Sequence, residues 1–153
     1  MRRVLAACGG FLLAVLWFDL MFDVQVLPYR GAPELPEPVL ASIAAYYRRV
    51  ATDAFPMNRL VAAIMLVTIA GAGYVLVRAR ARRGRAALAL ALAVAPITLA
   101  AARVVPDAMR LGSRVDSIAR QSELARTIWH DHLACWIAVA AFVILQLLDA
   151  GGP

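Results

Sequence analysis

The chain has 153 residues, of which 63% are hydrophobic and only 17% are charged, and its formal net charge is +6. A soluble domain carries about 25% charged and about 45–50% apolar residues. The composition therefore excludes an ordinary soluble enzyme, a disordered chain and a collagen-like chain. It indicates a single integral membrane domain over residues 1–153.

Four apolar segments have the length of about 20 residues that a membrane-spanning helix needs. The sequence therefore predicts an all-α, four-helix transmembrane bundle. The first segment, which follows Met1, ends at Trp17, Phe18 and Asp19 without a small-residue cleavage site, so it is interpreted as an uncleaved span and not as a signal peptide. The predicted spans are residues 4–22, 59–77, 86–105 and 128–148.

The loop after the first span is predicted to contain an extra amphipathic helix. Its first half is broken by prolines, and apolar side chains then recur at helical spacing over residues 39–50. Such a helix either anchors on the membrane surface or forms a lid over a pocket. The apolar positions are Val39, Ile43, Tyr46, Tyr47 and Val50.

The third span contains Pro96, which is expected to kink it. Helix is nevertheless expected to continue past Pro106, because Arg103 and Asp107 stand four residues apart, as do Asp116 and Arg120.

The basic residues indicate how the chain lies in the membrane. All 16 are arginine, and five of them fall within residues 78–85, between the second and third spans. A short basic loop between spans is typical of the cytoplasmic side, which is a simpler interpretation than nucleic-acid binding. Both termini are then cytoplasmic in a plasma (inner) membrane, and the loops 24–57 and 106–126 face outward.

Cys8 and Cys135 lie toward opposite faces in this topology, so no disulfide is expected.

Polar residues gather at the outward ends of all four predicted helices. Adjacent ends of an up-down bundle are neighbours in space, so these residues are expected to form one outward-facing cluster. They are Asp19 and Asp23 on the first helix, Asn58 and Arg59 on the second, Arg103 and Asp107 on the third, and His130, Asp131 and His132 on the fourth.

Three main interpretations of this cluster remain open, and transport is a fourth, less favoured one. The first is a structural network in which Arg103 pairs with an aspartate and the histidines are satisfied locally. The second is a transition-metal site made of Asp19, Asp23 and His132. The third is acid–base catalysis on a lipophilic substrate, in which a histidine backed by Asp131 or Asp23 abstracts a proton and Arg103 stabilises an oxyanion. Haem is disfavoured, because the two histidines of the chain are nearly adjacent on one helix.

Several short motifs resemble the anthrone-oxygenase-like family of small four-span membrane proteins. They are Pro96-Ile97-Thr98, Pro106-Asp107, Arg110-Leu111, Trp129 followed by His132, Tyr46-Tyr47 and Pro56-Met57-Asn58. Asp107 stands where the family tends to have asparagine, and Cys135 stands where it has arginine.

The resemblance implies oxidation of an activated polycyclic phenolic carbon by dioxygen without an organic cofactor. His132 would be the base, and Asp107, Arg103 and Asn58 would orient the substrate.

The resulting prediction is an oxygenase-type oxidoreductase that uses no cofactor or a transition metal. The alternative is a non-enzymatic membrane subunit, within a homo-oligomer or membrane complex, that binds a protein partner or lipid through its outer loops. The candidate catalytic residues are His132, His130, Asp131, Arg103 and Asp107, and the candidate substrate-binding residues are Asn58, Trp129, Trp17 and Tyr47.

Overall fold

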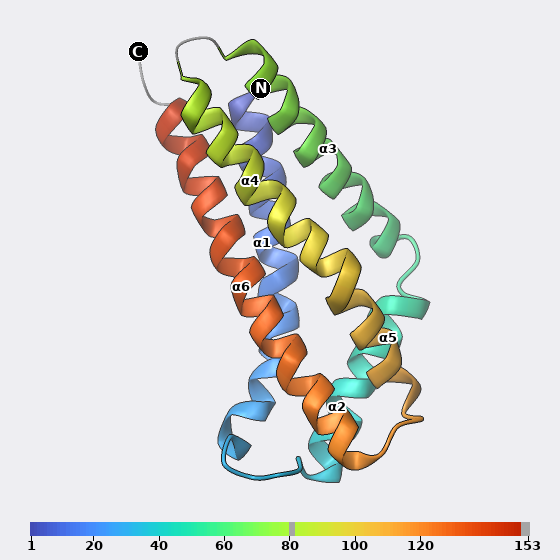
Figure 1. Ribbon diagram of the computed structural model, residues 1–153. Coiled ribbons are helices and arrows are strands. Elements are labelled where there is room, and N and C mark those ends of the chain that lie inside the picture. Colours follow the sequence, from blue (N-terminus) through green and yellow to red (C-terminus); the bar gives the residue numbers. More distant parts are fainter. Residues whose placement is uncertain (80–81, 151–153) are drawn as a thin grey trace.

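Four long helical segments lie side by side in the protein (Figure 1). The computed structural model describes residues 1–79 and 82–150, and within these ranges the chain is helical and contains no strand. Each long segment is apolar enough to cross a membrane, and each contains one of the four predicted spans. The prediction of an all-helical bundle with four long apolar helices is confirmed. The segments are Arg2–Tyr29, Met57–Arg78, Arg83–Ser113 and Ile118–Asp149.

Arg2 and Asp149 lie together at one end of the bundle, which we call the terminal end (Figure 1). The opposite end, which we call the loop end, carries two shorter helices, α2 (Glu37–Arg48) and α5 (Val105–Ser113). The bundle helices are α1 (Arg2–Asp23), α3 (Met57–Arg78), α4 (Arg83–Leu99) and α6 (Ile118–Ala150).

Helix α2 occupies the place where the periodicity predicts a helix in the first loop. It follows the 3-10 turn η1 (Val24–Tyr29) and begins with prolines at its N-cap and in its first turn, where a missing amide hydrogen costs nothing. It ends in the π-helical turn η2 (Arg49–Asp53). Its apolar side chains pack into a loop-end core with residues of α5 and α6. The buried residues of α2 are Leu40, Ile43, Ala44 and Tyr47.

The third span changes its helical geometry at the loop end. Pro96 lies inside α4, where it donates no amide hydrogen, and the chain then passes through the π-helical turn η3 (Ala100–Val104) into α5. The thiol of Cys135 donates to the carbonyl oxygen of Pro96 at 3.5 Å. Helix therefore continues past Pro106, as predicted, and stops at Arg114, whose φ of 57° is left-handed.

Helix α6 is long enough to cross a bilayer and stand beyond it. Its 33 residues span about 50 Å at about 1.5 Å per residue, whereas a hydrocarbon core is about 30 Å thick. The part of α6 at the loop end holds the first loop in place: Arg126 donates to the carbonyl oxygens of Tyr29, Ala32 and Pro33 at 3.3, 2.7 and 3.2 Å.

At the terminal end, small residues allow α1 to pack closely on its neighbours. A Cβ added at Gly9 would lie 2.6 Å from Val143 of α6, and one added at Gly71 would lie 2.8 Å from Leu5 of α1. These contacts surround a second core of Leu5, Ala72, Ala89, Ala93 and Phe142.

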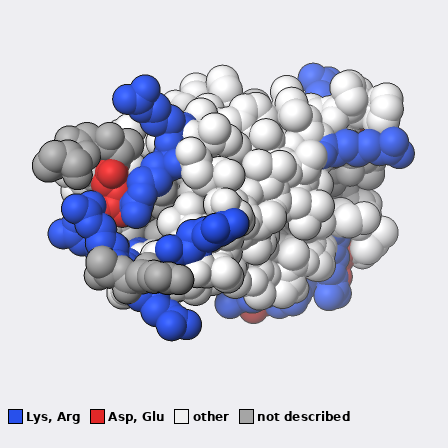
Figure 2. Space-filling model, turned by 90° about the horizontal axis from the view of Figure 1, so that it is seen from above, with Lys and Arg blue, Asp and Glu red and all other residues white. Residues whose placement is uncertain are grey.

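A buried carboxylate ties the chain ends together at the terminal end. Asp149 of α6 pairs with Arg2 of α1, and Arg82 and Arg85 lie 3.8 and 3.4 Å from it. Figure 2 looks onto this end and shows basic side chains gathered around an acidic patch. Arg82 and Arg85 of the basic loop thus lie at the same end as Arg2, as the topology requires. Both cysteines are buried and free, as expected.

Candidate active site

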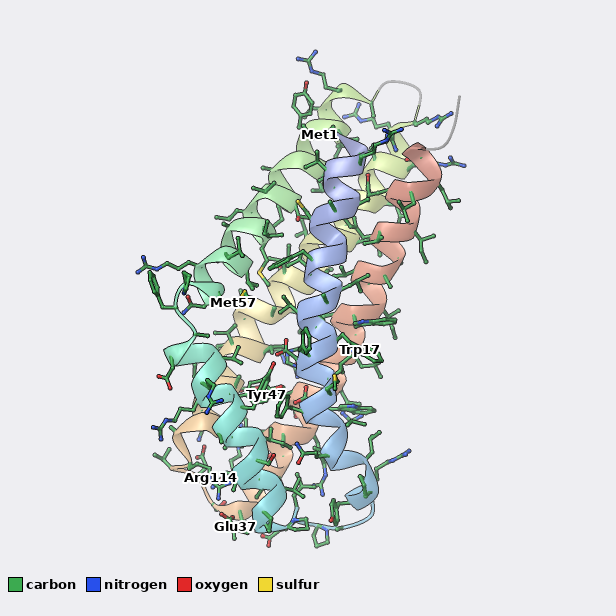
Figure 3. The ribbon with its side chains drawn as sticks, turned by 180° about the vertical axis from the view of Figure 1, so that it is seen from behind. Met1, Trp17, Glu37, Tyr47, Met57 and Arg114 are labelled. Atoms are coloured by element: carbon green, nitrogen blue, oxygen red, sulfur yellow. The ribbon has the colours of Figure 1, made fainter. Side chains whose placement is uncertain are left out.

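Five polar side chains from three helices meet at the loop end, and we call them the polar cluster. Asp19 and Asp23 come from α1, Tyr46 and Tyr47 from α2, and His132 from α6. Tyr46 is half-buried and the other four are buried. Figure 3 shows Tyr47 lying between α2 and the bundle.

Local helix geometry explains how α1 and α2 pair. Asp19 and Asp23 are one helical turn apart and therefore share a face of α1. The consecutive tyrosines of α2 each donate to one of them: the Tyr46 hydroxyl to Asp19 Oδ1 at 2.7 Å, and the Tyr47 hydroxyl to Asp23 Oδ1 at 2.5 Å. The two hydrogen bonds attach α2 to the last turn of α1.

Asp23 also holds the imidazole of His132. Its side chain is fully buried, and its Oδ2 lies 2.7 Å from His132 Nδ1. The Tyr47 hydroxyl lies 3.3 Å from the same nitrogen. Because the carboxylate accepts a hydrogen bond from Nδ1–H, it selects the neutral tautomer whose other nitrogen, Nε2, is an acceptor. This is the arrangement by which a carboxylate orients a histidine base.

The Nε2 atom of His132 points toward the second carboxylate without bonding to it. It lies 3.8 Å from Asp19 Oδ2, which is too long for a hydrogen bond. Nε2 is therefore in a position to take a proton from a bound molecule.

The two tyrosines act as hydrogen-bond donors in this cluster. Burial, followed by the negative charges of the aspartates, raises the pKa of both hydroxyls far above the ordinary value; for Tyr47 the main charge is that of Asp23, and for Tyr46 that of Asp19. Both hydroxyls keep their protons at ordinary pH and donate them in hydrogen bonds to the aspartates.

The polar cluster borders a cavity of about 570 Å³. That volume is within the range of about 300–1,000 Å³ typical of small-molecule sites. Polar side chains line it mainly at its loop end, where Asp19, Tyr46, Tyr47 and His132 face it, with Asn58 of α3 beside them. Its apolar wall includes Phe11, Val15, Val61, Met65, Ile97 and Val139.

Among the residues predicted to be catalytic, the structure places His132 at the cavity. His130 is exposed and its Nδ1 lies 2.7 Å from the carbonyl oxygen of Arg126 on its own helix. Since the two histidines are two residues apart on α6, they point to nearly opposite sides. Of the two histidines, His132 is therefore the one that lines the cavity.

The predicted catalytic residues Asp131, Arg103 and Asp107 do not line the cavity. Arg103 lies 3.3 Å from Asp131 and forms an ion pair with it outside the polar cluster. Arg103 is part of the π-helical turn η3, whereas Asp107 lies in α5, so the regular spacing on which their predicted pairing depends is altered. The interpretation as a structural network, in which Arg103 pairs with an aspartate and a histidine is satisfied locally, therefore fits Arg103, Asp131 and His130. These three residues lie outside the polar cluster.

Only some of the predicted substrate-binding residues line the cavity. Tyr47 and Asn58 line it, whereas Trp17 and Trp129 do not. Trp17 is 56% exposed and packs near Trp136, and Trp129 packs on His130 and the loop-end core. Trp17 is two residues from Asp19 and so points away from the face of α1 that carries the aspartates.

The proposed metal ligands Asp19, Asp23 and His132 are neighbours, but each is engaged by another side chain of the cluster. Within residues 1–79 and 82–150 no group of three or more histidine, cysteine or acidic side chains has a geometry that would hold a metal ion. Metal binding at these residues stays a prediction.

Two cavity residues with polar side chains, Tyr46 and Cys135, are not in the predicted site. The sequence places Tyr46 on the apolar face of a surface helix and Cys135 at a buried apolar position, yet both line the cavity. The adjacent tyrosines and the two aspartates four residues apart are the sequence signal that could have shown the pairing of α1 with α2.

No protein-family model matches the chain, and no curated protein or solved structure matches it either. The resemblance to anthrone-oxygenase-like proteins thus stays a prediction.

Proposed function

We propose that the protein is a small membrane enzyme of the oxygenase type, in which His132 is the general base for a lipophilic substrate. The observation that carries this proposal is the buried pair of His132 and Asp23, whose imidazole borders an apolar cavity. A base oriented in this way contributes typically about 10²–10⁴-fold to a rate.

The chemistry follows from these contacts. Nε2 of His132 removes a proton from an activated carbon of the substrate, and Asp23 stabilises the imidazolium that forms. The resulting carbanion reacts with dioxygen. For a methylene group the overall change is R₂CH₂ + O₂ → R₂C=O + H₂O, in which the carbon loses four electrons and dioxygen gains four. The activated polycyclic phenolic carbon implied by the family resemblance fits this scheme.

We place the loop end at the outer face of a plasma (inner) membrane, with both termini cytoplasmic. The arginines of residues 78–85 support this orientation. Helix α2 then lies at the membrane surface as an amphipathic cover over the cavity.

The alternative function, a non-enzymatic subunit that binds through its outer loops, would call for an exposed apolar stripe on α2 with no cavity beneath. The larger apolar side chains of α2, Leu40, Ile43 and Tyr47, are instead buried. Its exposed positions include Ala41, Ala45 and Arg48. These observations favour an enzyme.

The test measures oxygen consumption by the purified protein in lipid nanodiscs with a panel of polycyclic phenols. His132→Gln and Asp23→Asn should each reduce the rate at least about 100-fold. His130→Gln is the matched control, because His130 is exposed and outside the cavity, and it should retain the wild-type rate.

Equal losses in the His130→Gln and His132→Gln variants would contradict the proposal, provided that all variants unfold at similar temperatures. Metal content, measured for the wild type and for His132→Ala, separates the metal interpretation from cofactor-free catalysis: metal that is bound by the wild type and lost in the variant would support the former.

A further inference from the structure

The mouth of the cavity lies between α1 and α3. Among the lining residues, those from α6 are all buried and α5 contributes one that is exposed, Val105, whereas α1 and α3 together contribute five. An opening must lie where lining side chains are also exposed to the outside. The exposed lining residues of these two helices are Ala14, Phe18, Met57, Asn58 and Ala62.

The separation of α1 and α3 toward the loop end is visible in two views (Figures 1 and 3). At the terminal end the two helices touch, since a Cβ on Gly71 would meet Leu5. The cavity begins further along, at Phe11 on α1 and Met65 on α3. The two helices therefore diverge along the cavity, and most of its exposed lining residues lie on them.

This mouth belongs to the part of the protein that would lie in lipid. Phe18 and Ala62 are within helical segments long and apolar enough to cross a membrane. Phe18 is 60% exposed, and exposed apolar side chains at this depth are expected to face acyl chains. A molecule dissolved in the bilayer can then reach the cavity without crossing water.

The charges at the loop end of the cavity restrict what can bind there. Asp19 and His132 line the cavity, and Asp23 lies next to them without lining it. The imidazole of His132 lies between the two carboxylates, 3.8 Å from Asp19 and 2.7 Å from Asp23. No arginine is among the described residues that line this cavity. An anionic group placed here would be removed from water and set beside two carboxylates, and both effects are unfavourable. A neutral hydroxyl can instead donate a hydrogen bond to His132 Nε2 or to the Tyr46 oxygen, whose own proton is donated to Asp19.

We infer that the cavity takes a neutral lipophile with a hydroxyl group at one end, that it enters from the bilayer between α1 and α3, and that Asp19 and Asp23 exclude anionic head groups. The inference rests on the proposed function, because it names the substrate class of the same site.

The test uses two fluorescent probes with the same ring system, 1-pyrenemethanol and 1-pyrenecarboxylate. Binding to the wild-type protein in nanodiscs is measured by energy transfer from its tryptophans to pyrene, with protein-free nanodiscs as the blank. The alcohol should bind saturably, and the carboxylate at pH 7.5 should bind at least about tenfold more weakly. Asp19→Asn should reduce this difference at least about threefold.

Entry is tested with a matched pair of variants on α3. Ala62 lines the mouth, and its neighbour Ala63 is exposed but does not line the cavity. Ala62→Phe should weaken binding of the alcohol at least about tenfold, and Ala63→Phe should leave it unchanged.

Three results would overturn the inference: no saturable binding of the alcohol, equal or tighter binding of the carboxylate by the wild type, or equal losses in the two alanine variants. None of these readouts depends on turnover. If the alcohol binds as expected but the oxygen-consumption assay detects no His132-dependent reaction, the proposed function fails while the binding inference stands.

Discussion

Asp23 shows how a carboxylate is kept inside an apolar bundle. The Tyr47 hydroxyl and His132 Nδ1 both contact it, at 2.5 and 2.7 Å. Removing one partner of a buried polar group costs about 1–3 kcal/mol, so each group of this trio depends on the other two. The sequence does not reveal the trio, because its members stand 24 and 109 positions from Asp23.

The tyrosines of the polar cluster should resist ionisation. Burial and the neighbouring aspartates raise their pKa, so the folded value exceeds the unfolded value of about 10. Their contribution to stability is therefore complete below about pH 10 and is lost as the pH rises above it. In an alkaline titration followed at 295 nm, the double variant Tyr46→Phe, Tyr47→Phe should give the same absorbance change near pH 10 as the wild type. A change that is smaller by two tyrosines would contradict the assigned environment.

At the scale of elements, hydropathy is sufficient to locate the spans but not their partners. All four predicted spans are helical, since about 20 consecutive apolar residues can satisfy their backbone in lipid only as a helix. The path of α4 into α5 is less predictable. Pro96 and Pro106 both interrupt the amide pattern there, yet helix continues through a π-helical turn.

Close packing of α5 on α2 is expected to be sensitive to one added methyl group. A Cβ at Gly112 would lie 3.0 Å from the backbone nitrogen of Arg48 and 3.2 Å from its Cα, whereas one at Gly73 would meet nothing within 4 Å. Gly112→Ala should lower the free energy of unfolding by about 1–3 kcal/mol, because backbone cannot move aside easily. Gly73→Ala should raise it by about 0.5–1 kcal/mol, because it lies within a helix.

Thermal unfolding in detergent compares the two variants with the wild type. Equal shifts of the unfolding temperature in both would show that α2 and α5 are not in close contact through Gly112.

At the scale of the whole molecule, the two ends of the bundle have different charge patterns. The terminal end carries the arginines around Asp149, and the loop end carries the polar cluster together with surface ion pairs such as Arg110 with Asp116 at 2.7 Å. Such a pair stabilises little, because exposed ion pairs are screened by water. The density of arginine at one end is what the topology prediction uses.

The orientation can be tested with cysteines introduced at the two ends. Ala45 at the loop end and Gly84 at the terminal end are exposed, and the native cysteines are buried and should react slowly. In intact cells a membrane-impermeant maleimide should label Ala45→Cys, and it should label Gly84→Cys only after permeabilisation. The reverse pattern would place the termini outside.

The sequence alone determined the four long apolar helices, the presence of a helix in the first loop and the end of the bundle at which the polar residues gather. These features depend on local composition and periodicity, which act through the backbone and the hydrophobic effect. Only the tertiary structure decided that His132 points inward while His130 does not, that Arg103 pairs with Asp131, and that Tyr46 and Tyr47 approach the aspartates. The physical reason is that these contacts depend on the rotation of each helix about its axis and on how α2 folds back over the bundle. Residues far apart in the chain together determine the rotation of each helix and the path of α2. The pattern of a single segment therefore does not reveal these contacts.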